Sequence, residues 1–491
     1  MSFLGLDIGT SAVKAVLVDG DQQLLAEAEV PLATSRPQPL WSEQDPEAWW
    51  TATRAALATL GSAARGAWGG VRGIGLSGQM HGAVVLGADD RPLRPAILWN
   101  DGRAQAECRV LAERVPGIGR IAGVPPTPGY TAPKLLWLQA HEPDLFARVA
   151  RVLLPKDYVR LKLTGEHATD PVDAAGTLWL DEARRAWSQE IVAATGLREA
   201  QLPRVVEGSA PAGAVRPAAA TALGLPAGIP VAAGAGDAAA GAIGIGAIKD
   251  GDAFVSLGTS AQYFVTTASY RPYPERVLQA YCHGLPDRWY QCAALLEGAS
   301  CLGWAASLLG EPDIPALVAR VEARWSAPSR VLFLPYLAGE RTPHADPAAR
   351  GVLMGLDAAT DATEIAQAVL EGVAFSLAEA QDCLAEAGTP VSALAAIGGG
   401  ARSPFWMRLL ATVLDRPVTL YAGAAKGPAT GAARLARLAL TGEAPEAVCT
   451  KPPVADVLEP HAPLVEAYRA RGERFRALYR ALRAEFAAGA G

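Results

Sequence analysis

A single carboxylate, Asp237, stands in the stretch "AAGAGDAAAGA" (232–242), where every other residue is alanine or glycine. A lone acid among such small residues has two explanations. It can cap a tight turn, because Asp and Gly are common turn residues. It can also be a catalytic base that needs backbone close by and room for a substrate. The stretch alone leaves both explanations open.

Two "GTSA" tetrapeptides, which begin at Gly9 and Gly258, each interrupt a pair of apolar segments. Glycine lets the backbone approach an anion closely, and successive N–H groups form an anion-binding nest. One copy would be an ordinary hairpin turn, whereas two copies favour a clamp on phosphate groups. Asp7 lies just before the first turn. An acid suits that place only if a divalent cation such as Mg²⁺ lies between it and the phosphates.

Two further polar stretches have the residue types that contact sugars. "SGQMHGA" places Met80 and His81 on a loop between predicted strands, and "LWNDGR" groups Trp99 and Asp101 at the end of a strand. A tryptophan beside an amide and an acid suits the apolar face and the hydroxyl groups of a sugar. The alternatives are a histidine bonded to backbone and a polar turn with a half-buried tryptophan, and they stay open here.

Other glycine-rich patterns exclude two classes of nucleotide site. "GIGLSG" (73–78) fits G-x-G-x-x-G, but that fingerprint must open a helix, and the residues after it predict a loop and a strand. No G-x-x-x-x-G-K-[ST] motif occurs, so a P-loop kinase is excluded. "IGGGARSPFW" (397–406) predicts a strand-to-helix turn that can pack against a flat ligand or a phosphate.

The segments that contain the two GTSA turns repeat one design. Segments 3–19 and 253–267 both predict an apolar strand, a turn and a second strand. Their separation of about half the chain predicts two copies of one domain fold. We therefore expect an N-terminal domain over residues 1–245 and a C-terminal domain over residues 246–491.

This division places Asp237 at the junction of the domains, and clefts between domains are preferred ligand sites. Helices are predicted after the N-cap Asp45, with Pro46 at the first helical position, and over residues 466–486 at the end of the chain. We expect the basic face of the final helix to be solvated, and we consider that this helix packs back on the first domain.

Composition excludes several classes of partner. The chain has 491 residues, a net charge of −6 and no basic run of the kind that binds nucleic acid. Its six cysteines include no C-x-x-C pair, which favours reduced thiols and a cytoplasmic protein. The N-terminus has no signal-peptide pattern, and no uncharged apolar run is long enough to span a membrane.

Taken together, the motifs resemble those of the FGGY carbohydrate kinases over nearly the whole chain. The resemblance rests on "GLDIGTSAVK", "SGQMHGA", "RPAILWNDGR", "TAPKLLW", "SLGTSAQYF", "FLPYLAGERTPHADP" and "IGGGAR". "GYTAPKLLWLQAH" is similar to a family signature, although Ala140 stands where a polar residue is usual. The resemblance implies an α/β, actin-like ATPase fold, with two ribonuclease-H-like domains around a central interdomain cleft.

The resemblance also implies an activity. The pairing of "SGQMHGA" with "WNDGR" is most similar to the branch of the family that transfers the γ-phosphoryl group of ATP to the 5-hydroxyl of D-xylulose. ATP and Mg²⁺ would be the cofactors, the ketose and ATP the small-molecule partners, and a homodimer is a family-level expectation. The alternatives are a kinase for ribulose, a deoxy-xylulose or a pentitol, and a non-catalytic actin-like nucleotide-binding protein.

Site residues follow from the resemblance by motif. Asp237 is the expected base, and Asp7 is the expected acid that helps to hold Mg²⁺, with Asp237 as a second metal ligand. The expected phosphate contacts are Gly9, Thr10, Lys14, Gly258 and Thr259, and the adenosine pocket is expected at Gly298, Gly399, Gly400 and Ser403. The expected sugar contacts are Met80, His81, Trp99, Asp101, Asp237 and Ala238.

Ala238 is a departure from the family pattern. Similar sequences carry asparagine after the catalytic acid, whereas this chain reads "GDAAAG". A methyl group neither donates nor accepts a hydrogen bond, so one sugar hydroxyl loses a partner. We hypothesise a higher KM for D-xylulose, a wider range of sugars, or both.

Overall fold

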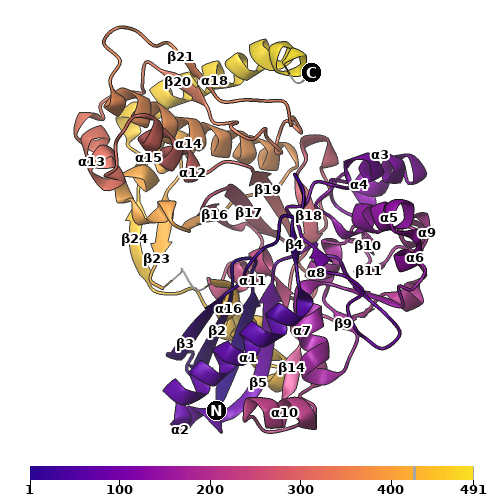
Figure 1. Cartoon of the computed structure of the whole chain (residues 1–491). Coiled ribbons are helices and arrows are strands. Elements are labelled where there is room, and N and C mark those ends of the chain that lie inside the picture. The colour runs from indigo at the N-terminus through magenta and orange to yellow at the C-terminus, as the bar shows by residue number, and fades with distance from the viewer. Residues whose placement is uncertain (424–426, 490–491) are drawn as a thin grey trace.

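The computed structural model describes residues 1–423 and 427–489, which form two α/β units, each built on a seven-stranded sheet (Figure 1). The first sheet has the order β13-β14-β5-β1-β2-β3, and β15 also pairs with β5. Its strands are β1 (Ser2–Ile8), β2 (Ala12–Asp19), β3 (Leu24–Pro31), β5 (Val71–Gly78), β13 (Pro211–Ala214), β14 (Pro230–Ala232) and β15 (Ala235–Gly236).

The second sheet has the order β18-β19-β17-β16-β22-β23-β24. Its strands are β16 (Asp252–Leu257), β17 (Ala261–Thr267), β18 (Gln279–Cys282), β19 (Trp289–Leu295), β22 (Ala393–Ile397), β23 (Val418–Tyr421) and β24 (Val454–Leu458). The predicted repeat is present in both sheets. Each GTSA turn joins an antiparallel pair, β1–β2 or β16–β17, and the first strand of each pair also has a parallel neighbour.

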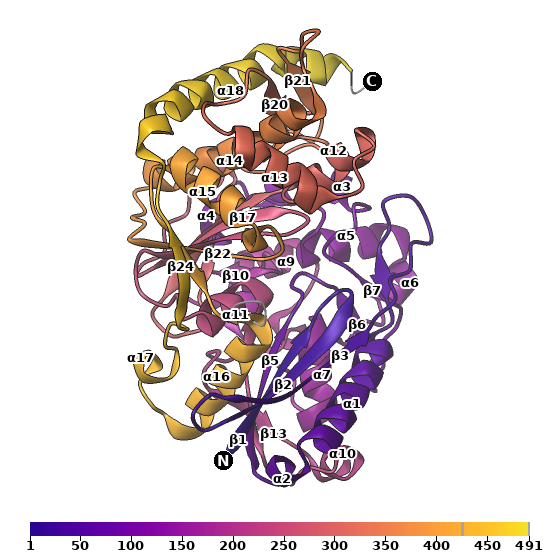
Figure 2. The same cartoon turned by 90° about the vertical axis from the view of Figure 1, so that its left-hand side faces the viewer.

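Alternation along β1 sends neighbouring side chains to opposite faces of the first sheet. Leu4, Leu6 and Ile8 pack against α1 (Pro46–Ala63) and α7 (Pro155–Thr164) on one face. Phe3 packs on the other face against α16 (Gly427–Thr441), a helix from the second half of the chain (Figure 2). Helix α1 begins as predicted, since the carboxylate of its N-cap, Asp45, accepts from the Glu47 N–H at 3.0 Å.

Glycine makes the contact between α16 and the first unit very close. A Cβ on Gly75 of β5 would lie 1.8 Å from the Ala432 carbonyl oxygen, and one on Gly5 of β1 would lie 1.9 Å from that of Ala429. A Cβ on Gly431 would likewise lie 1.9 Å from the carbonyl oxygen of Ala240 in α11 (Asp237–Gly244). Backbone therefore packs directly on backbone here, and no larger residue fits.

Helix α11 lies between the two sheets (Figure 1). Its Ala239 and Ile243 share one hydrophobic core with Phe254 and Phe264 of the second sheet. The opposite face of the second sheet packs against α12 (Ser300–Leu308), α14 (Ala362–Glu386) and α15 (Pro404–Leu414). The residue at the start of α11, Asp237, is therefore set at the junction of the two units.

The final helix, α18 (Ala462–Ala488), packs against α14, α15 and β20 (Leu332–Leu334) of the second unit. The expectation that it packs back on the first domain is wrong. Its Tyr468, Phe475 and Tyr479 join a cluster with Tyr336 and Phe375, so aromatic packing fixes it there. The helix from the second half of the chain that packs on the first sheet is α16. The basic residues of α18 do not indicate which unit that helix packs on, because its aromatic residues make the contacts.

The remaining elements connect and cover the two sheets. They include β4 (Glu43–Gln44), β6 (Val84–Leu86), β7 (Ala96–Ile97), α3 (Gln105–Arg114), α5 (Thr131–His141), β8 (Arg151–Leu153), α8 (Pro171–Ala175), α9 (Gln189–Ala194), α10 (Pro217–Leu223), α13 (Ile314–Arg324) and β21 (Val352–Met354). Among the helices that the structure describes, none combines the length and apolarity that crossing a membrane requires.

Candidate active site

Asp237 is the first residue of α11 and follows directly on β15. Strand β15 pairs in parallel with β5, with Ala235 opposite Ser77. The glycines before Asp237 allow this approach. Gly234 has a φ of 85°, and a Cβ there would lie 2.0 Å from the Leu76 carbonyl oxygen. The Asp237 side chain is exposed to solvent, and its Oδ1 accepts from the Ala238 N–H at 2.7 Å.

Asp7 and Asp237 are close enough for their charges to interact. Loss of bulk solvent, and then the negative charge of Asp237, raise the pKa of Asp7 to about 7. The protein around Asp237 removes part of its hydration although the side chain stays accessible, and this raises its pKa to about 6, against the lowering effect of the Ala238 N–H. Asp7 Oδ1 is buried and has no partner among the described residues. Two carboxylates with unused oxygens fit the ligand set of Mg²⁺.

The first GTSA turn is held by protein side chains. The Gly9 N–H donates to the Ala12 carbonyl at 3.0 Å. The Thr10 hydroxyl donates to Gln79 Oε1 and accepts from Trp99 Nε1, each at 2.9 Å. Lys14 is exposed and stands opposite Asp7 in the β1–β2 register. This turn is therefore a fixed element with a cation and an acid side by side.

The second GTSA turn is held mainly through its backbone. The Gly258 N–H donates to the Ser260 carbonyl at 3.0 Å, and the Gly258 carbonyl accepts from the Ala299 N–H at 2.7 Å. The Ser300 hydroxyl donates to the Thr259 carbonyl at 2.6 Å. A Cβ on Gly298 would lie 2.5 Å from the Ser260 carbonyl oxygen, so Gly298 belongs to the wall of this turn.

The "IGGGAR" turn lies against the end of β16, beside the second GTSA turn. A Cβ on Gly400 would lie 2.5 Å from the Leu257 side chain, whereas one on Gly399 would meet nothing closer than 3.8 Å. Gly399 thus faces open space that a ligand can use. The Ser403 hydroxyl accepts from the Trp406 N–H at 3.2 Å and caps α15, so that oxygen already serves the helix.

Met80 and His81 lie on the loop after β5, next to Asp237. A Cβ on Gly236 would lie 2.5 Å from Met80 Sδ, so the methionine packs directly on the residue before Asp237. His81 Nδ1 lies 2.9 Å from the Gly176 carbonyl oxygen, and burial lowers the pKa of His81 to about 3. The ring is therefore neutral. Because a carbonyl only accepts, the proton is on Nδ1 and Nε2 is an acceptor.

The remaining expected sugar contacts differ in what they can do. Trp99 is 39% exposed and is bonded through its indole N–H to Thr10, which places it beside the first GTSA turn. Asp101 is buried, and its carboxylate accepts from the Ser42 N–H and from Arg103. Asp101 therefore supports the loop as an ion pair and is not free to bind a sugar. Ala238 is half-buried in the first turn of α11.

Sequence reasoning missed two residues that contact His81, namely Tyr130 and Lys134. The Tyr130 ring packs edge-on against His81, with centroids 4.5 Å apart, and its hydroxyl accepts from Gln279 Nε2 at 3.0 Å. Lys134 of α5 is wholly buried and bonded to the His81 carbonyl. A signal existed in "TAPKLLW", since a lysine in an otherwise apolar helix needs partners, but no role was assigned to it.

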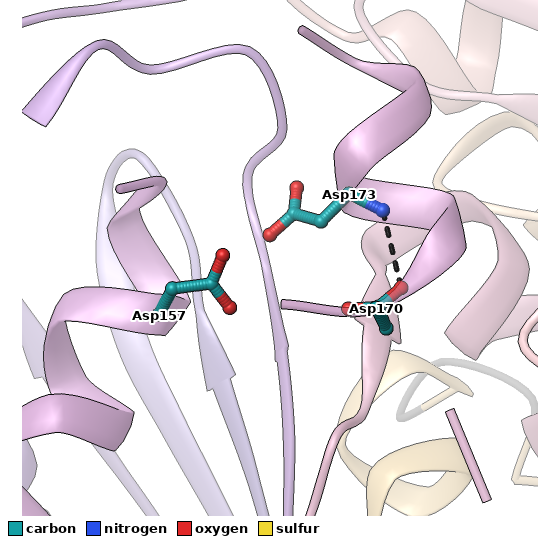
Figure 3. A group of neighbouring side chains, drawn as sticks. All are labelled: Asp157, Asp170 and Asp173. Atoms are coloured by element: carbon teal, nitrogen blue, oxygen red, sulfur yellow. Dashed lines mark hydrogen bonds between the residues drawn. The ribbon is translucent and has the colours of Figure 1, made fainter. Parts of the chain in front are cut away.

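Three buried carboxylates, Asp157, Asp170 and Asp173, face one another from α7 and from the start of α8 (Figure 3). The Lys156 ammonium lies 2.6, 2.6 and 2.9 Å from their oxygens, so a lysine fills the place that a metal would take. Burial alone would lower the pKa of Lys156, but the carboxylates raise it. This cluster is a buried ion network, and it anchors α8, which ends just before the Gly176 that bonds the His81 ring.

Comparisons with known proteins agree with this arrangement. Residues 2–244 match the N-terminal domain of the FGGY family of carbohydrate kinases, and residues 253–440 match its C-terminal domain. The chain belongs to the FGGY carbohydrate kinase family. It is 45% identical to the xylulose kinase of Escherichia coli (strain K12), over 98% of this chain and 99% of that one.

Solved structures of family members share the fold. A "xyloylose kinase" from Brucella ovis superposes with a TM-score of 0.96 at 47% identity, over 99% of this chain and 100% of that chain. A xylulose kinase from Rhodospirillum rubrum gives a TM-score of 0.91 at 30% identity, with the same coverage. The fold is thus the two-domain fold of this family, as the sequence motifs predict.

Proposed function

We propose that this kinase transfers the γ-phosphoryl group of ATP to the 5-hydroxyl of D-xylulose, with Asp237 as the general base. One observation carries the proposal. Asp237 is solvent-accessible, has a pKa raised to about 6, and adjoins the Met80–His81 loop and Asp7 at the junction of the two units. The similarity to proteins named xylulose kinase supports the choice of sugar.

The sugar would bind between the Met80–His81 loop and the start of α11. His81 Nε2 accepts from a sugar hydroxyl, because its Nδ1 proton is already donated to Gly176. The apolar Met80 and the exposed Trp99 face the carbon skeleton. This arrangement orients the 5-hydroxyl toward Asp237, and such orientation accounts for a large part of phosphoryl-transfer catalysis.

Asp237 then accepts the proton of the attacking hydroxyl. A pKa of about 6 leaves the carboxylate mostly ionised at neutral pH while keeping it basic enough to take a proton. The bond from the Ala238 N–H fixes the orientation of the carboxylate. The proton leaves the sugar oxygen as that oxygen bonds to the phosphorus, and the bond between the γ-phosphorus and the β–γ bridging oxygen breaks.

The two GTSA turns would hold the nucleotide from opposite units. Gly9, Thr10 and Lys14 contact the phosphates from the first sheet, and Gly258 and Thr259 contact them from the second. Gly298, Gly399 and Gly400 line the adenosine pocket, where Gly399 has open space beside it. Mg²⁺ held by Asp7 and Asp237 would neutralise charge on the phosphate oxygens. Approach of the two units excludes water, which would otherwise compete as acceptor.

We also place the enzyme in the cytoplasm, because its six cysteines are free and buried in the structure. A homodimer is the oligomeric state that we expect from the family resemblance. Sedimentation velocity of the purified chain decides between a monomer and a dimer.

A kinase for another ketose or a pentitol is the second candidate, and Ala238 favours it. The methyl group at this place offers no hydrogen bond with which to select one sugar over another. The deciding experiment is ADP release with ATP and Mg²⁺ over a panel of D-xylulose, ribulose, deoxy-xylulose and pentitols. D-xylulose should give the highest kcat/KM. If another sugar gives a higher kcat/KM, that sugar becomes the proposed substrate. If no sugar stimulates ADP release, the proposal of a sugar kinase activity is refuted.

A further inference from the structure

Lys134 is a buried cation without a bonded carboxylate among the residues that the structure describes. Its Nζ donates to the His81 carbonyl at 2.9 Å and to the Gly129 carbonyl at 2.6 Å. Burial lowers the pKa of this ammonium to about 7. A buried polar group is retained at such a cost only where its hydrogen bonds have a structural or functional use. Here both bonds go to backbone beside the candidate sugar pocket.

The first of these bonds holds His81 in an unfavourable conformation. His81 has a φ of 70°, in the left-handed region that side chains other than glycine seldom adopt. Its carbonyl oxygen accepts from Lys134 and also from the Thr131 hydroxyl at 3.0 Å. Two donors from the start of α5 thus fix the peptide after His81. The ring is fixed separately, through Gly176.

The second bond holds the segment just before α5. Gly129 packs on the Trp99 carbonyl, since a Cβ there would lie 2.4 Å from that oxygen. The next residue, Tyr130, contacts the His81 ring edge-on. One ammonium therefore links the backbone of the His81 loop to that of the Tyr130 segment. Without it, the two segments lose the donor that they share.

We propose that Lys134 is a positioning residue for the sugar pocket, which fixes His81 Nε2 and the Tyr130 ring where a sugar hydroxyl meets them. The inference rests on the proposed function, because it takes the His81 loop to be the sugar site. Lys134 itself is buried and touches no substrate. Its effect is therefore on sugar binding, and the nucleotide site, built from the two GTSA turns, is independent of it.

The test is Lys134→Met, which keeps the length of the side chain and removes the donors. The KM for D-xylulose should rise about tenfold, as expected when buried carbonyls lose a donor. The kcat, the KM for ATP and the ATP hydrolysis without sugar should stay within about twofold of the wild type. Lys162→Met is the matched control, because Lys162 lies at the surface of α7 in an ion pair with Glu47. It should change none of these constants.

Thr131→Val is the milder second variant, which removes one donor from the His81 carbonyl and leaves Lys134 in place. It should raise the KM for D-xylulose by a smaller factor than Lys134→Met does, and it keeps the test valid if Lys134→Met does not fold. An unchanged sugar KM in both variants, or an equal rise in the KM for ATP, overturns the inference.

A crystal structure gives a readout that does not depend on activity. In Lys134→Met, or in Thr131→Val if the former does not fold, the His81 φ should leave the left-handed region or the His81 loop should become disordered. An unchanged His81 backbone overturns the inference even if the wild type proves inactive on every sugar. An inactive wild type by itself refutes the proposed function instead, so the two failures are distinguishable.

Discussion

The two hairpins that carry the GTSA turns have the same arrangement of neighbouring strands but different polar side chains beside the turn. In the first, Asp7 precedes the turn and pairs in register with Lys14. In the second, Ser256 holds the place equivalent to Asp7 and pairs with Gln262. Both strands lie between an antiparallel and a parallel neighbour. The repeat therefore supplies two similar turns, proposed here as phosphate sites, and only the first has an acid and a lysine paired beside it.

The difference follows from the position of Asp237. Only the first sheet passes directly into α11, through β15 and its pairing with β5. A carboxylate on β1 therefore lies near the proposed base and can share a cation with it, whereas Ser256 has no such acid among its strand neighbours. Under the proposed function, the two similar domains would hold one nucleotide between them, and the single catalytic centre would lie where the first domain meets the junction.

The largest expected effect comes from removing the carboxylate of Asp237, the proposed base near the first hairpin. Asp237→Asn keeps the volume of the side chain and removes the proton acceptor. We expect kcat to fall by about 10³, in the range typical of general bases. The melting temperature should change little, because Asp237 is exposed. Steady-state kinetics and calorimetry check both values, and near-wild-type kcat would contradict the role of Asp237.

Asp7→Ser makes the first hairpin resemble the second and tests the comparison itself. We expect kcat to fall by about 10², since the carboxylate proposed to hold Mg²⁺ is lost. The Mg²⁺ concentration for half-maximal activity should rise as well. Titration of activity with Mg²⁺ measures this shift. Ser256→Ala, at the equivalent place in the second hairpin, is the matched control and should leave the Mg²⁺ dependence unaltered.

The pH dependence of kcat/KM for the sugar should reveal the role of Asp237 without a mutation. The pKa of Asp237 is raised to about 6, and a base acts only when ionised. Saturating Mg²⁺ favours the ionised form of Asp7, so Asp237 should decide the profile. The kcat/KM for the sugar should be nearly constant above pH 7 and fall by up to about tenfold for each pH unit below 6. A profile from pH 5 to 8 at saturating ATP and Mg²⁺ tests this. If kcat/KM does not fall between pH 6 and 5, the reaction does not require the ionised form of a group with this pKa, and the role of Asp237 as base is contradicted.

The smallest expected effect is at Ala238, in the first turn of α11. Ala238→Asn adds a donor and an acceptor toward the proposed sugar site, and the KM for D-xylulose should fall by up to about tenfold. The kcat should stay within about twofold, because Asp237 keeps its place. Kinetics with D-xylulose and with one poorer sugar measure both affinity and selectivity. If neither parameter moves, the hypothesis about this departure is wrong.

Much of the fold was predictable from local pattern. The two GTSA turns predicted the strand pairs that the structure contains, and Asp45 and Pro46 predicted the start of α1. These features depend on neighbouring residues, so a single sequence is enough to find them. The α/β, two-domain family fold was inferred correctly through motifs that span nearly the whole chain.

The rest depends on contacts between distant segments. The packing of α16 on the first sheet, and of α18 on α14, α15 and β20 of the second unit, is decided by glycines and aromatics that are far apart in sequence. Asp101 looked like a sugar contact because its partner Ser42 is remote. Lys134 looked unremarkable for the same reason, since the His81 carbonyl that it binds lies in another loop.

The covering of the first sheet by α16 has a consequence for how the protein is made. The sheet's last strand ends at Gly236, but the helix that covers one of its faces begins only at Gly427. Phe3 and the glycines Gly5 and Gly75 stay uncovered while the ribosome adds the intervening segment. This takes on the order of ten seconds or more at ordinary synthesis rates. The first domain to emerge is thus completed only after most of the second has been made, and the face of its sheet that α16 covers stays uncovered during that interval.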